Sequence, residues 1–518
     1  MNQPKLALGT LPNQAAASIL AGLDLGTTVA ETDPLLESAR VETSVFDDLL
    51  GDRVDLIPGT KGSGKSALYR ILVDFLPVIM LQNRRVVIAH GVQEKQDSVF
   101  LAFKEQFDKL AESAFVDFWC IYLVSLAHEQ FIKNPRFQPY ISDSDAQVEA
   151  FRAAYRQAQI PDLDRQKTLK EIIAWGLAVL GQLRPTVRWK QTPDGGQIDF
   201  SLDLSRSVET AGKPSDAEPK MPERVEPIIA RLNELLERTN LSLWLMVDRL
   251  DELFERRSET ERRALRGLLR ALRLFSSSRV RLKIFLRDDI LEHIVGPDGF
   301  TALTHVTARM SDTLRWSEEQ ILVMIVKRFS TNSYVRGIFG LDEELVRTSP
   351  EYQLQTFYCI FADSVYRPPN QSSTLRWIYN HCKDGRGVVT PRDVIELVNR
   401  ASQKQRDLFR AEPSGATARL IHGPAIVYGL DELSRLKRTT YLEAEFPHKW
   451  GQIRKLVGGG TEYSQTSLRR MYGKSADRII EELVSIGILS RGTRQGEPAY
   501  KVQFLYRRGL ECTQKFIG

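Results

Sequence analysis

The stretch Gly59–Ser66 has the residue types and the spacing needed to hold a phosphate group. It consists of Gly59-Thr60-Lys61-Gly62-Ser63-Gly64-Lys65-Ser66 and fits the P-loop pattern G-x-x-x-x-G-K-[ST]. Its glycines let the backbone turn several N–H groups onto one anion. We expect Lys65 to reach the β- and γ-phosphates of ATP, Ser66 to bind Mg²⁺, and Ala67 to lie with them in the nucleotide site. The alternative is a glycine-rich turn that fits the pattern by chance.

Both flanks of this stretch support the first interpretation. Residues 54–58 predict a short strand that enters the loop, and residues 66–72 predict the helix that leaves it. The N-terminus of such a helix carries a partial positive charge, which attracts the same anion.

An acidic segment follows a second apolar run. Residues 243–247 are unbroken in their apolar character, which is typical of a strand buried on both faces of a parallel sheet. Carboxylates after such a strand lie where open α/β sheets bind ligands. We expect Asp248 to be the outer-sphere partner of Mg²⁺, and either Asp251 or Glu252 to orient the attacking water. The alternative is a solvated acidic turn.

A third predicted strand, at 281–286, ends at Arg287. A polar residue at the end of the strand beside the acidic one is well placed to sense the γ-phosphate, and Arg287 is the candidate. The alternative is an ion pair of Arg287 with Asp288 or Asp289 at the edge of the sheet.

The composition of the whole chain bounds the class of protein. The chain has 518 residues, of which 42% are hydrophobic and 26% are charged, so we expect several domains with large cores. A net charge of +5 does not by itself require nucleic acid as a partner. Apolar runs are too short to cross a membrane, and the N-terminus has no signal-peptide pattern. Four scattered cysteines and histidines without metal-ligand spacing predict a cytoplasmic protein without disulfides or zinc.

We predict an α/β fold in four parts, with a parallel-sheet P-loop NTPase core. The parts are a flexible N-terminal arm at 1–33, the ATPase core at 34–315, a helical lid domain at 316–430 and a winged-helix domain at 431–518. We expect the core to begin with a helix at 34–50. A strand at 86–89, after a helix that ends near Leu81, completes the βαβ order of a parallel sheet.

The core contains a large insert at 92–222. Lys65 and Asp248 are 183 positions apart (248 minus 65), and a compact core needs far fewer residues between them. Apolar spacing predicts helices in the first part of the insert, at 99–113, 115–132, 145–157 and 167–183. Period-two segments then predict a β-hairpin at 186–190 and 198–204, and a flexible linker follows at 206–222. The insert is either scaffold or a site for a partner or a neighbouring subunit.

An arginine-rich helix is predicted between the acidic strand and the strand of Arg287. Its leucines form an inward face and its arginines an outer one. The arginines are Arg256, Arg257, Arg262, Arg263, Arg266, Arg270 and Arg273. They form a solvated face with nearby glutamates, or one of them reaches the ATP of a neighbouring subunit as an arginine finger.

The helical lid contains a second arginine of interest. Thr390 and Pro391 are good N-cap and first-turn residues for a helix that continues through Val398. Arg392 lies in the first turn, where the helix dipole disfavours a cation. It is a candidate to touch nucleotide from the lid, and the alternative is a surface ion pair with Asp393 or Glu396.

The last part of the chain has the pattern of a winged helix. Two helices at 466–472 and 476–485 precede two strands at 486–491 and 499–504. The second helix carries Glu481 and Glu482, whereas a helix that contacts bases is usually more basic.

Together these motifs resemble prokaryotic STAND and KAP-like P-loop ATPases, which are relatives of AAA+ proteins. The resemblance covers most of residues 34–518 and is carried by Gly59–Ser66, M246-V-D-R-L-D-E252, K283-I-F-L-R-D-D289 and T390-P-R-D393. It implies an ASCE-type core, a helical lid and a winged helix, and many such proteins act as molecular switches, some in anti-phage defence. One residue departs from the pattern: Arg249 stands where many relatives have a second acid, which leaves the identity of the base open.

Two classes of function follow. The first is an ATP-binding and hydrolysing switch that forms homo-oligomers and controls a protein partner or effector, with a role in anti-phage defence implied by the resemblance. The second is a DNA-associated ATPase that uses the winged helix for loading or remodelling. Binding to DNA that weakens with salt would favour the second, and assembly in ATP without DNA would favour the first.

Overall fold

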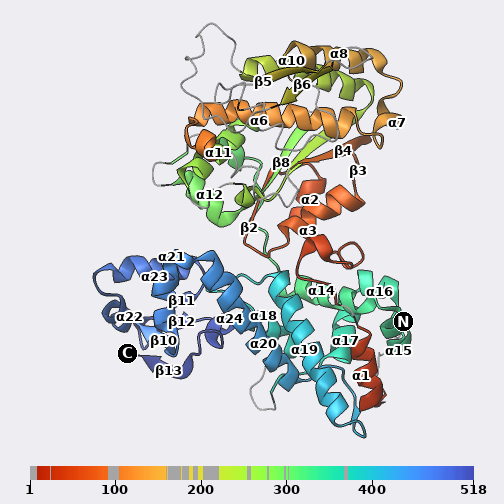
Figure 1. Ribbon diagram of the computed structural model, residues 1–518. Coiled ribbons are helices and arrows are strands. Elements are labelled where there is room, and N and C mark those ends of the chain that lie inside the picture. Colours follow the sequence, from red (N-terminus) through yellow and green to blue (C-terminus); the bar gives the residue numbers. More distant parts are fainter. Residues whose placement is uncertain are drawn as a thin grey trace. The chain divides into compact units, whose positions relative to one another are not determined.

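The computed structural model describes residues 9–23, 25–91, 104–158, 160, 177, 186–190, 197–201, 221–253, 258–276, 279–296, 299–300, 303–366 and 372–517. They form a mixed α/β structure in which many helices accompany a largely parallel sheet (Figure 1). The chain divides into two compact units. The sheet unit comprises Ser44–Thr60 and Lys65–Leu314, and the helical unit comprises Met1–Thr43, Lys61–Gly64 and Arg315–Gly518.

The sheet unit is built on five strands in the order β2-β8-β7-β4-β3 (Figure 1). Four of them are parallel: β2 (Leu56–Gly59), β8 (Val280–Arg287), β7 (Leu241–Val247) and β4 (Arg84–Gly91). The fifth, β3 (Val78–Leu81), is antiparallel to β4. The strands predicted before the loop, before Asp248 and before Arg287 are confirmed. Every residue of β7 is buried, as its apolar run predicts.

The register brings the ends of three strands to one edge of the sheet. Gly59 lies opposite Arg287 in the β2–β8 pair, and Val247 lies opposite Ile284 in the β7–β8 pair. β8 therefore lies between the strand of the glycine-rich loop and the acidic strand. Residues 309–314 cover the other side of β2, where the Leu314 N–H donates to the Pro58 carbonyl at 3.0 Å.

The helices next to the loop are shorter than predicted. α3 (Lys65–Arg70) continues only as the π-helical turn η2 (Ile71–Phe75), because Pro77 disfavours helix in the residue before it and has no N–H to donate. Residues up to Leu81 form β3 instead of helix. The helix predicted at 34–50 is also wrong in length, since only α2 (Ser44–Leu50) is helical.

The insert forms a helical layer with a hairpin (Figure 1). Its elements are α5 (Lys104–Asp108), α6 (Glu112–Ala127), η3 (His128–Ile132), α7 (Gln138–Ile141), α8 (Asp145–Gln157), β5 (Thr186–Lys190) and β6 (Gln197–Ser201), and α10 (Met221–Arg238) leads from it to β7. The predicted helices at 115–132 and 145–157 and the antiparallel hairpin are confirmed. Within the described part of 99–113, α5 is shorter than the prediction. Of the helix predicted at 167–183 only residue 177 is described, and of the linker predicted at 206–222 only residues 221 and 222 are described, where α10 has already begun.

The arginine-rich helix packs closely on this layer. α11 (Glu259–Ala271) buries Leu265, Leu268 and Leu269, as predicted for its inward face. A Cβ added at Gly267 would lie 2.7 Å from the Cβ of Phe115, so the close approach of α11 and α6 requires glycine. α12 (Asp288–Val295) and α13 (Leu303–Thr307) follow β8.

The helical unit has its own core. Its main helices are α14 (Glu318–Ser330), α15 (Ser333–Phe339), α16 (Glu343–Thr348), α17 (Pro350–Ile360), α18 (Thr374–His381), α19 (Pro391–Ala411) and α20 (Gly423–Lys437). Thr390 caps α19 as predicted, since its hydroxyl accepts from the Asp393 N–H at 3.2 Å.

The flexible N-terminal arm is a wrong prediction for the described residues from 9 to 33. α1 (Asn13–Ala21) packs against α19 and buries Ala16, Ile19 and Leu20 in the core of the helical unit. β1 (Leu11–Pro12) pairs with β9 (Ala416–Thr417). Small and apolar residues at helical spacing let α1 fit against a longer helix, a tertiary contact that local composition does not reveal.

The C-terminal part of the helical unit alternates helices and strands. It comprises the π-helical turn η5 (Arg438–Glu443), α21 (Pro447–Ile453), β10 (Gly460–Ser464), α22 (Gln465–Tyr472), α23 (Ala476–Ser485), β11 (Leu489–Arg494), β12 (Glu497–Val502), α24 (Phe504–Arg507) and β13 (Thr513–Ile517). The two predicted helices and the hairpin β11–β12 are confirmed. β10 adds to β12 and β13 adds to β10, so the sheet has the order β11-β12-β10-β13.

Candidate functional site

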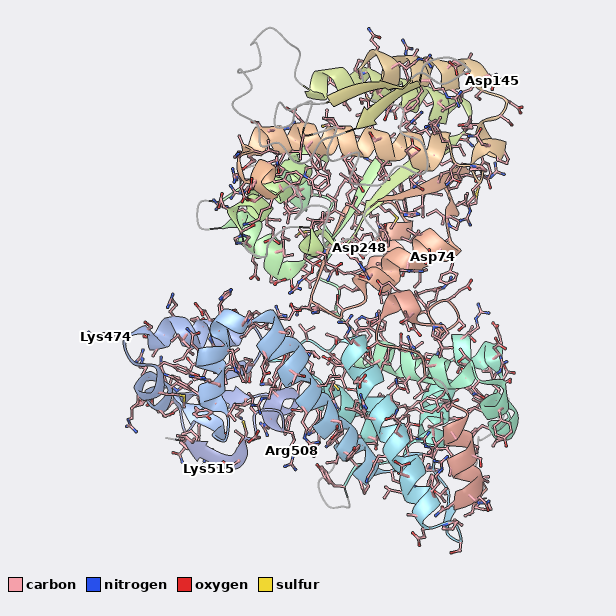
Figure 2. The ribbon with its side chains drawn as sticks, in the orientation of Figure 1. Asp74, Asp145, Asp248, Lys474, Arg508 and Lys515 are labelled. Atoms are coloured by element: carbon pink, nitrogen blue, oxygen red, sulfur yellow. The ribbon has the colours of Figure 1, made fainter. Side chains whose placement is uncertain are left out.

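The glycine-rich loop leaves β2 at the edge of the sheet where β7 and β8 also end. Asp248 follows β7 directly, and Figure 2 labels it at this edge. Gly62 and Gly64 have φ of +83° and +102°, a region in which residues with a side chain are strained. The two glycines therefore let the loop take the tight curve that a phosphate site requires.

Lys65 is buried at the start of α3. Its Nζ donates to the carbonyls of Gly59 at 2.6 Å and of Thr60 at 2.9 Å. Burial lowers the pKa of Lys65 to about 8, although Asp248, Asp251 and Asp288 oppose the shift. Among the described residues, no carboxylate forms an ion pair with this ammonium group. A bound anion would therefore compensate a charge that the chain leaves poorly neutralised.

Two hydroxyl groups of the loop are buried without a hydrogen-bond partner within the described parts of the chain. They are Thr60 Oγ1 and Ser63 Oγ, on residues that are 4% and 1% exposed. A buried hydroxyl without a partner is unfavourable by about 1–3 kcal/mol. Both groups can donate to phosphate oxygens.

Ser66 and Asp248 are the residues predicted to bind Mg²⁺. Burial raises the pKa of the Asp248 carboxylate, against the opposing effects of the Ser66 hydroxyl, the Arg249 backbone N–H and Lys65. Arg249 has φ of +59°, which is uncommon for a residue with a long side chain and is often found at functional sites. A cation beside Asp248 would stabilise its ionised form.

Arg287 connects β8 to the acidic segment. It is buried, and its guanidinium forms two hydrogen bonds of 2.9 Å to Asp289. A third bond of 3.3 Å runs from Arg287 Nη1 to Asp251 Oδ2. The ion pair foreseen as the alternative to a sensing role is present with Asp289, and the contact with Asp251 was not foreseen.

The two candidate bases differ in their surroundings. Asp251 lies close enough to Lys65 and Asp248 to affect the pKa of both, and it is held by Arg287. The side chain of Glu252 is 47% exposed and lies 3.7 Å from Arg249. Asp251 is thus the acid that the structure brings together with the loop lysine.

Asp288 also belongs to this group, although sequence reasoning treated it only as an ion-pair partner of Arg287. It is one of the three carboxylates that act on Lys65. Its position directly after β8 was the available signal, because all parallel strands end at the same edge.

The middle of the loop has contacts of its own within the helical unit. Trp316 Nε1 donates to the Ser63 carbonyl at 2.7 Å, and Lys61 forms an ion pair with Glu445. A Cβ at Gly62 would lie 3.3 Å from the Cβ of Arg392. Sequence reasoning missed Trp316 and Glu445, since neither belongs to a motif.

Arg392 lies beside the loop, but with partners other than those expected. Its Nε donates to the Thr28 carbonyl at 3.1 Å. The expected partners are bound elsewhere: Asp393 to Lys437 at 3.0 Å, and Glu396 to Arg400 at 2.8 Å. The predicted surface ion pair of Arg392 is therefore wrong.

The described arginines of α11 have partners in their own unit. Arg263 and Arg266 donate to backbone carbonyls, of Leu110 and of Ile294 among others. Arg262 pairs with Glu259 at 3.0 Å and Arg270 with Glu112 at 2.6 Å. These bonds support the interpretation as a structural face; Arg256 and Arg257 lie outside the described residues.

The residues at this edge fit Mg²⁺ and ATP chemically. No group of three or more His, Cys, Asp or Glu that could hold a metal is found in the described ranges. Mg²⁺ usually takes one or two protein ligands together with water and phosphate oxygens, and a hydroxyl and a carboxylate are suitable oxygen ligands. Ser66 and Asp248 are the residues that would hold it.

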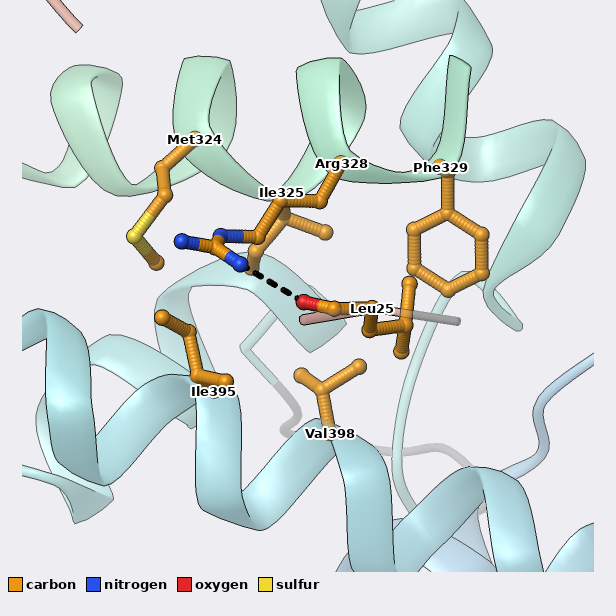
Figure 3. A pocket seen from close by; sticks show the side chains of 7 residues that line it. All are labelled: Leu25, Met324, Ile325, Arg328, Phe329, Ile395 and Val398. Atoms are coloured by element: carbon orange, nitrogen blue, oxygen red, sulfur yellow. Dashed lines mark hydrogen bonds between the residues drawn. The ribbon is translucent and has the colours of Figure 1, made fainter. Parts of the chain in front are cut away.

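A separate cavity in the helical unit is too small for a ligand. It is lined by Leu25, Met324, Ile325, Arg328, Phe329, Ile395 and Val398 (Figure 3). Its volume of about 10 Å³ is at the lower limit for holding one water molecule.

Comparison with known proteins assigns no relative: no protein-family model matches the chain, and no curated protein matches it. Of the helices in the described ranges, none combines the length and the apolar character that crossing a membrane requires.

Proposed function

We propose that the protein binds and hydrolyses ATP with Mg²⁺ and acts as a nucleotide-dependent switch. The observation that carries this proposal is the set of unsatisfied donors in one loop. Buried Lys65 has only loop carbonyls as partners, and the hydroxyls of Thr60 and Ser63 have none among the described residues. A triphosphate offers acceptors for all three groups, with charge that offsets the ammonium.

The positions of the chain's own residues suggest a division of roles. Loop N–H groups and Lys65 would hold the phosphates, and Ser66 with Asp248 would hold the cation. Mg²⁺ and ATP would supply the Lewis acid and the phosphoryl group. Asp251 would accept a hydrogen bond from the attacking water, with Arg287 fixing the carboxylate. Glu252 is the alternative base.

The strand order supports an ASCE-type P-loop core as the finer fold. β8 lies between the loop strand and the acidic strand, so Arg287 lies opposite Gly59 in the β2–β8 pair and bonds to Asp251 of the acidic segment. The order α21, β10, α22, α23, β11, β12 likewise supports a winged helix. With the helical lid, these features agree with the resemblance to STAND and KAP-like ATPases. Homo-oligomerisation is a separate part of the proposal and has to be tested in solution.

The exposed face of α23 favours a protein partner over DNA. Its exposed residues are Asp477, Arg478, Glu481 and Ser485, so acids outnumber bases on the helix that would enter a major groove. A DNA-associated ATPase stays the alternative, because the wing strand β11 carries Arg491 and Arg494. Those two arginines are paired with Glu481 and Glu462, which weakens that alternative.

Calorimetry of the full chain with Mg²⁺ and ATP tests the proposal. Lys65→Ala should weaken ATP binding by about a hundredfold and abolish turnover, since it removes a charged donor to phosphate. Lys104→Ala, which changes an exposed lysine of α5, is the matched control and should bind ATP as the wild type does. Equal affinity in all three chains would place any nucleotide site elsewhere.

A further inference from the structure

An N-terminal segment is fastened across two helices of the helical unit. We call Gly22–Leu23 and Leu25–Asp33 the N-terminal strap. Its backbone carbonyls accept hydrogen bonds from side chains of α14 and α19 and from Asn332, the N-cap residue of α15. The bonds are Arg328 to Leu25 at 2.7 Å, Asn332 to Gly22 at 2.9 Å, Arg392 to Thr28 at 3.1 Å and Asn399 to Gly26 at 3.2 Å. Side chains at four separate points thus recognise the backbone of the strap.

The strap is also held in one conformation. Arg328 forms a buried ion pair of 2.5 Å with Asp33, and Figure 3 shows its bond to the Leu25 carbonyl. Gly26 has φ of +77°, and a Cβ there would lie 2.2 Å from Asp33 Oδ1. Backbone curvature and charge pairing therefore leave the strap little freedom to shift past α14 and α19.

One of the fastening residues also touches the phosphate loop. Arg392 donates to the strap through Nε, while a Cβ at Gly62 would lie 3.3 Å from its Cβ and 3.5 Å from its Cδ. Thr390 Oγ1 is 3.4 Å from the same point. The stem of Arg392 thus lies against the loop at Gly62, where φ is +83°. Asn399, two helical turns later, binds the strap and is not among the residues nearest to Gly62.

We propose that Arg392 is a positioning residue for the phosphate loop. The Thr28 carbonyl holds the guanidinium, and the stem then supports Gly62 in the conformation that turns the loop amides toward one point. Arg392 does not donate to the nucleotide itself, in contrast to its role predicted from the sequence. This inference rests on the proposed ATP site.

Paired variants separate positioning from direct contact. Arg392→Ala should weaken ATP and ADP binding by the same factor, about tenfold, because both nucleotides use the loop. A direct contact with the γ-phosphate would weaken ATP alone. Arg392→Met keeps most of the stem and should retain most of the affinity, and Asn399→Ala, which removes a strap bond only, should bind as the wild type does.

Hydrogen exchange without nucleotide gives a second readout. Amides of Gly59–Ser66 should exchange faster in Arg392→Ala than in Asn399→Ala, with equal melting temperatures. Unchanged exchange and unchanged nucleotide affinity in Arg392→Ala would overturn the inference, as would a loss confined to ATP. A wild-type chain that fails to bind ATP would instead overturn the proposed function, and faster exchange in Arg392→Ala would still support the positioning contact.

Discussion

Two buried lysines of the sheet unit, one beside the amino end of β2 and one beyond its carboxyl end, have opposite surroundings. Lys283 of β8 is fully buried, and its Nζ donates to Asp52 at 2.6 Å, to Asp55 at 2.8 Å and to the Val54 carbonyl at 2.7 Å. An ammonium group has three N–H donors, so this one is satisfied. Lys65, beyond the carboxyl end of β2, donates to two loop carbonyls and to no other group in the described part of the chain.

The surrounding charges reinforce the difference. At the amino end, burial alone would raise the pKa of Asp52, but Lys283, Arg281 and Arg309 lower it overall. At the carboxyl end, burial lowers the pKa of Lys65 to about 8. The chain completes its own ion network where the role is structural and leaves donors uncompensated where we propose a ligand. A buried charge therefore indicates a binding site only when groups of opposite charge do not pair with it.

We expect the largest effect on stability from a substitution of Lys283, whose hydrogen bonds are all satisfied. Lys283→Met would leave Asp55 buried beside one remaining cation, Arg309, and should lower the free energy of unfolding by about 3–5 kcal/mol. Lys65→Met should leave the free energy of unfolding unchanged or raise it, because an uncompensated charge is removed. Chemical denaturation of both variants measures the difference. Equal losses would mean that the two lysines have the same structural role.

Charge removal from the candidate bases should affect turnover and spare binding. Asp251→Asn or Glu252→Gln should slow ATP hydrolysis by roughly 10²-fold if the residue positions the water. We expect the larger loss for Asp251→Asn, since Asp251 lies near Lys65. Steady-state rates and ATP affinity of each variant identify the base. Wild-type rates in both would remove these acids from the mechanism.

The lowered pKa of Lys65 predicts a pH dependence that Lys283 does not share. Phosphate binding needs the ammonium form, so ATP affinity should fall about tenfold between pH 7 and pH 9. The effect of pH on the stability of the fold has the opposite sign. Between pH 8 and the ordinary lysine pKa of 10.5 the unfolded chain binds more protons, so the contribution of Lys65 to stability rises with pH. Titration calorimetry at both pH values checks the first effect, and Lys65→Ala, assayed at concentrations that reveal its weaker binding, should show no such fall.

We expect the smallest effect on ATPase activity from the arginines of α11, which contact neither of the two lysines. Mixing Lys65→Ala with Arg270→Ala should restore part of the ATPase activity if an arginine crosses to a neighbouring subunit, because some interfaces would pair an intact loop with an intact arginine. The bond of Arg270 to Glu112 predicts little recovery for this residue. Light scattering with ATP reports self-association in the same samples. A monomer without recovery would leave Arg270 as a structural ion-pair residue.

Motifs with local causes were predictable from the sequence. Glycines, a following lysine and the strand before them identify the loop, and an unbroken apolar run identifies β7. The hairpin β5–β6, the cap at Thr390 and the C-terminal helices also follow from period and turn chemistry over short distances. In each case the determining residues are close together in the chain.

The partners of each charge were decided only by the tertiary structure. Lys283 is more than two hundred positions from Asp52 and Asp55, and Arg287 meets Asp251 because β8 lies beside β7. The packing of α1, the contact of Arg392 with Thr28 and the bond from Trp316 to Ser63 likewise join distant segments. Sequence patterns specify which side chains carry charge or face inward, whereas strand order and helix packing determine which of them meet. For this reason the candidate phosphate loop and its acids could be predicted from the sequence, whereas the hydrogen-bond partners of each buried charge are known only from the structure.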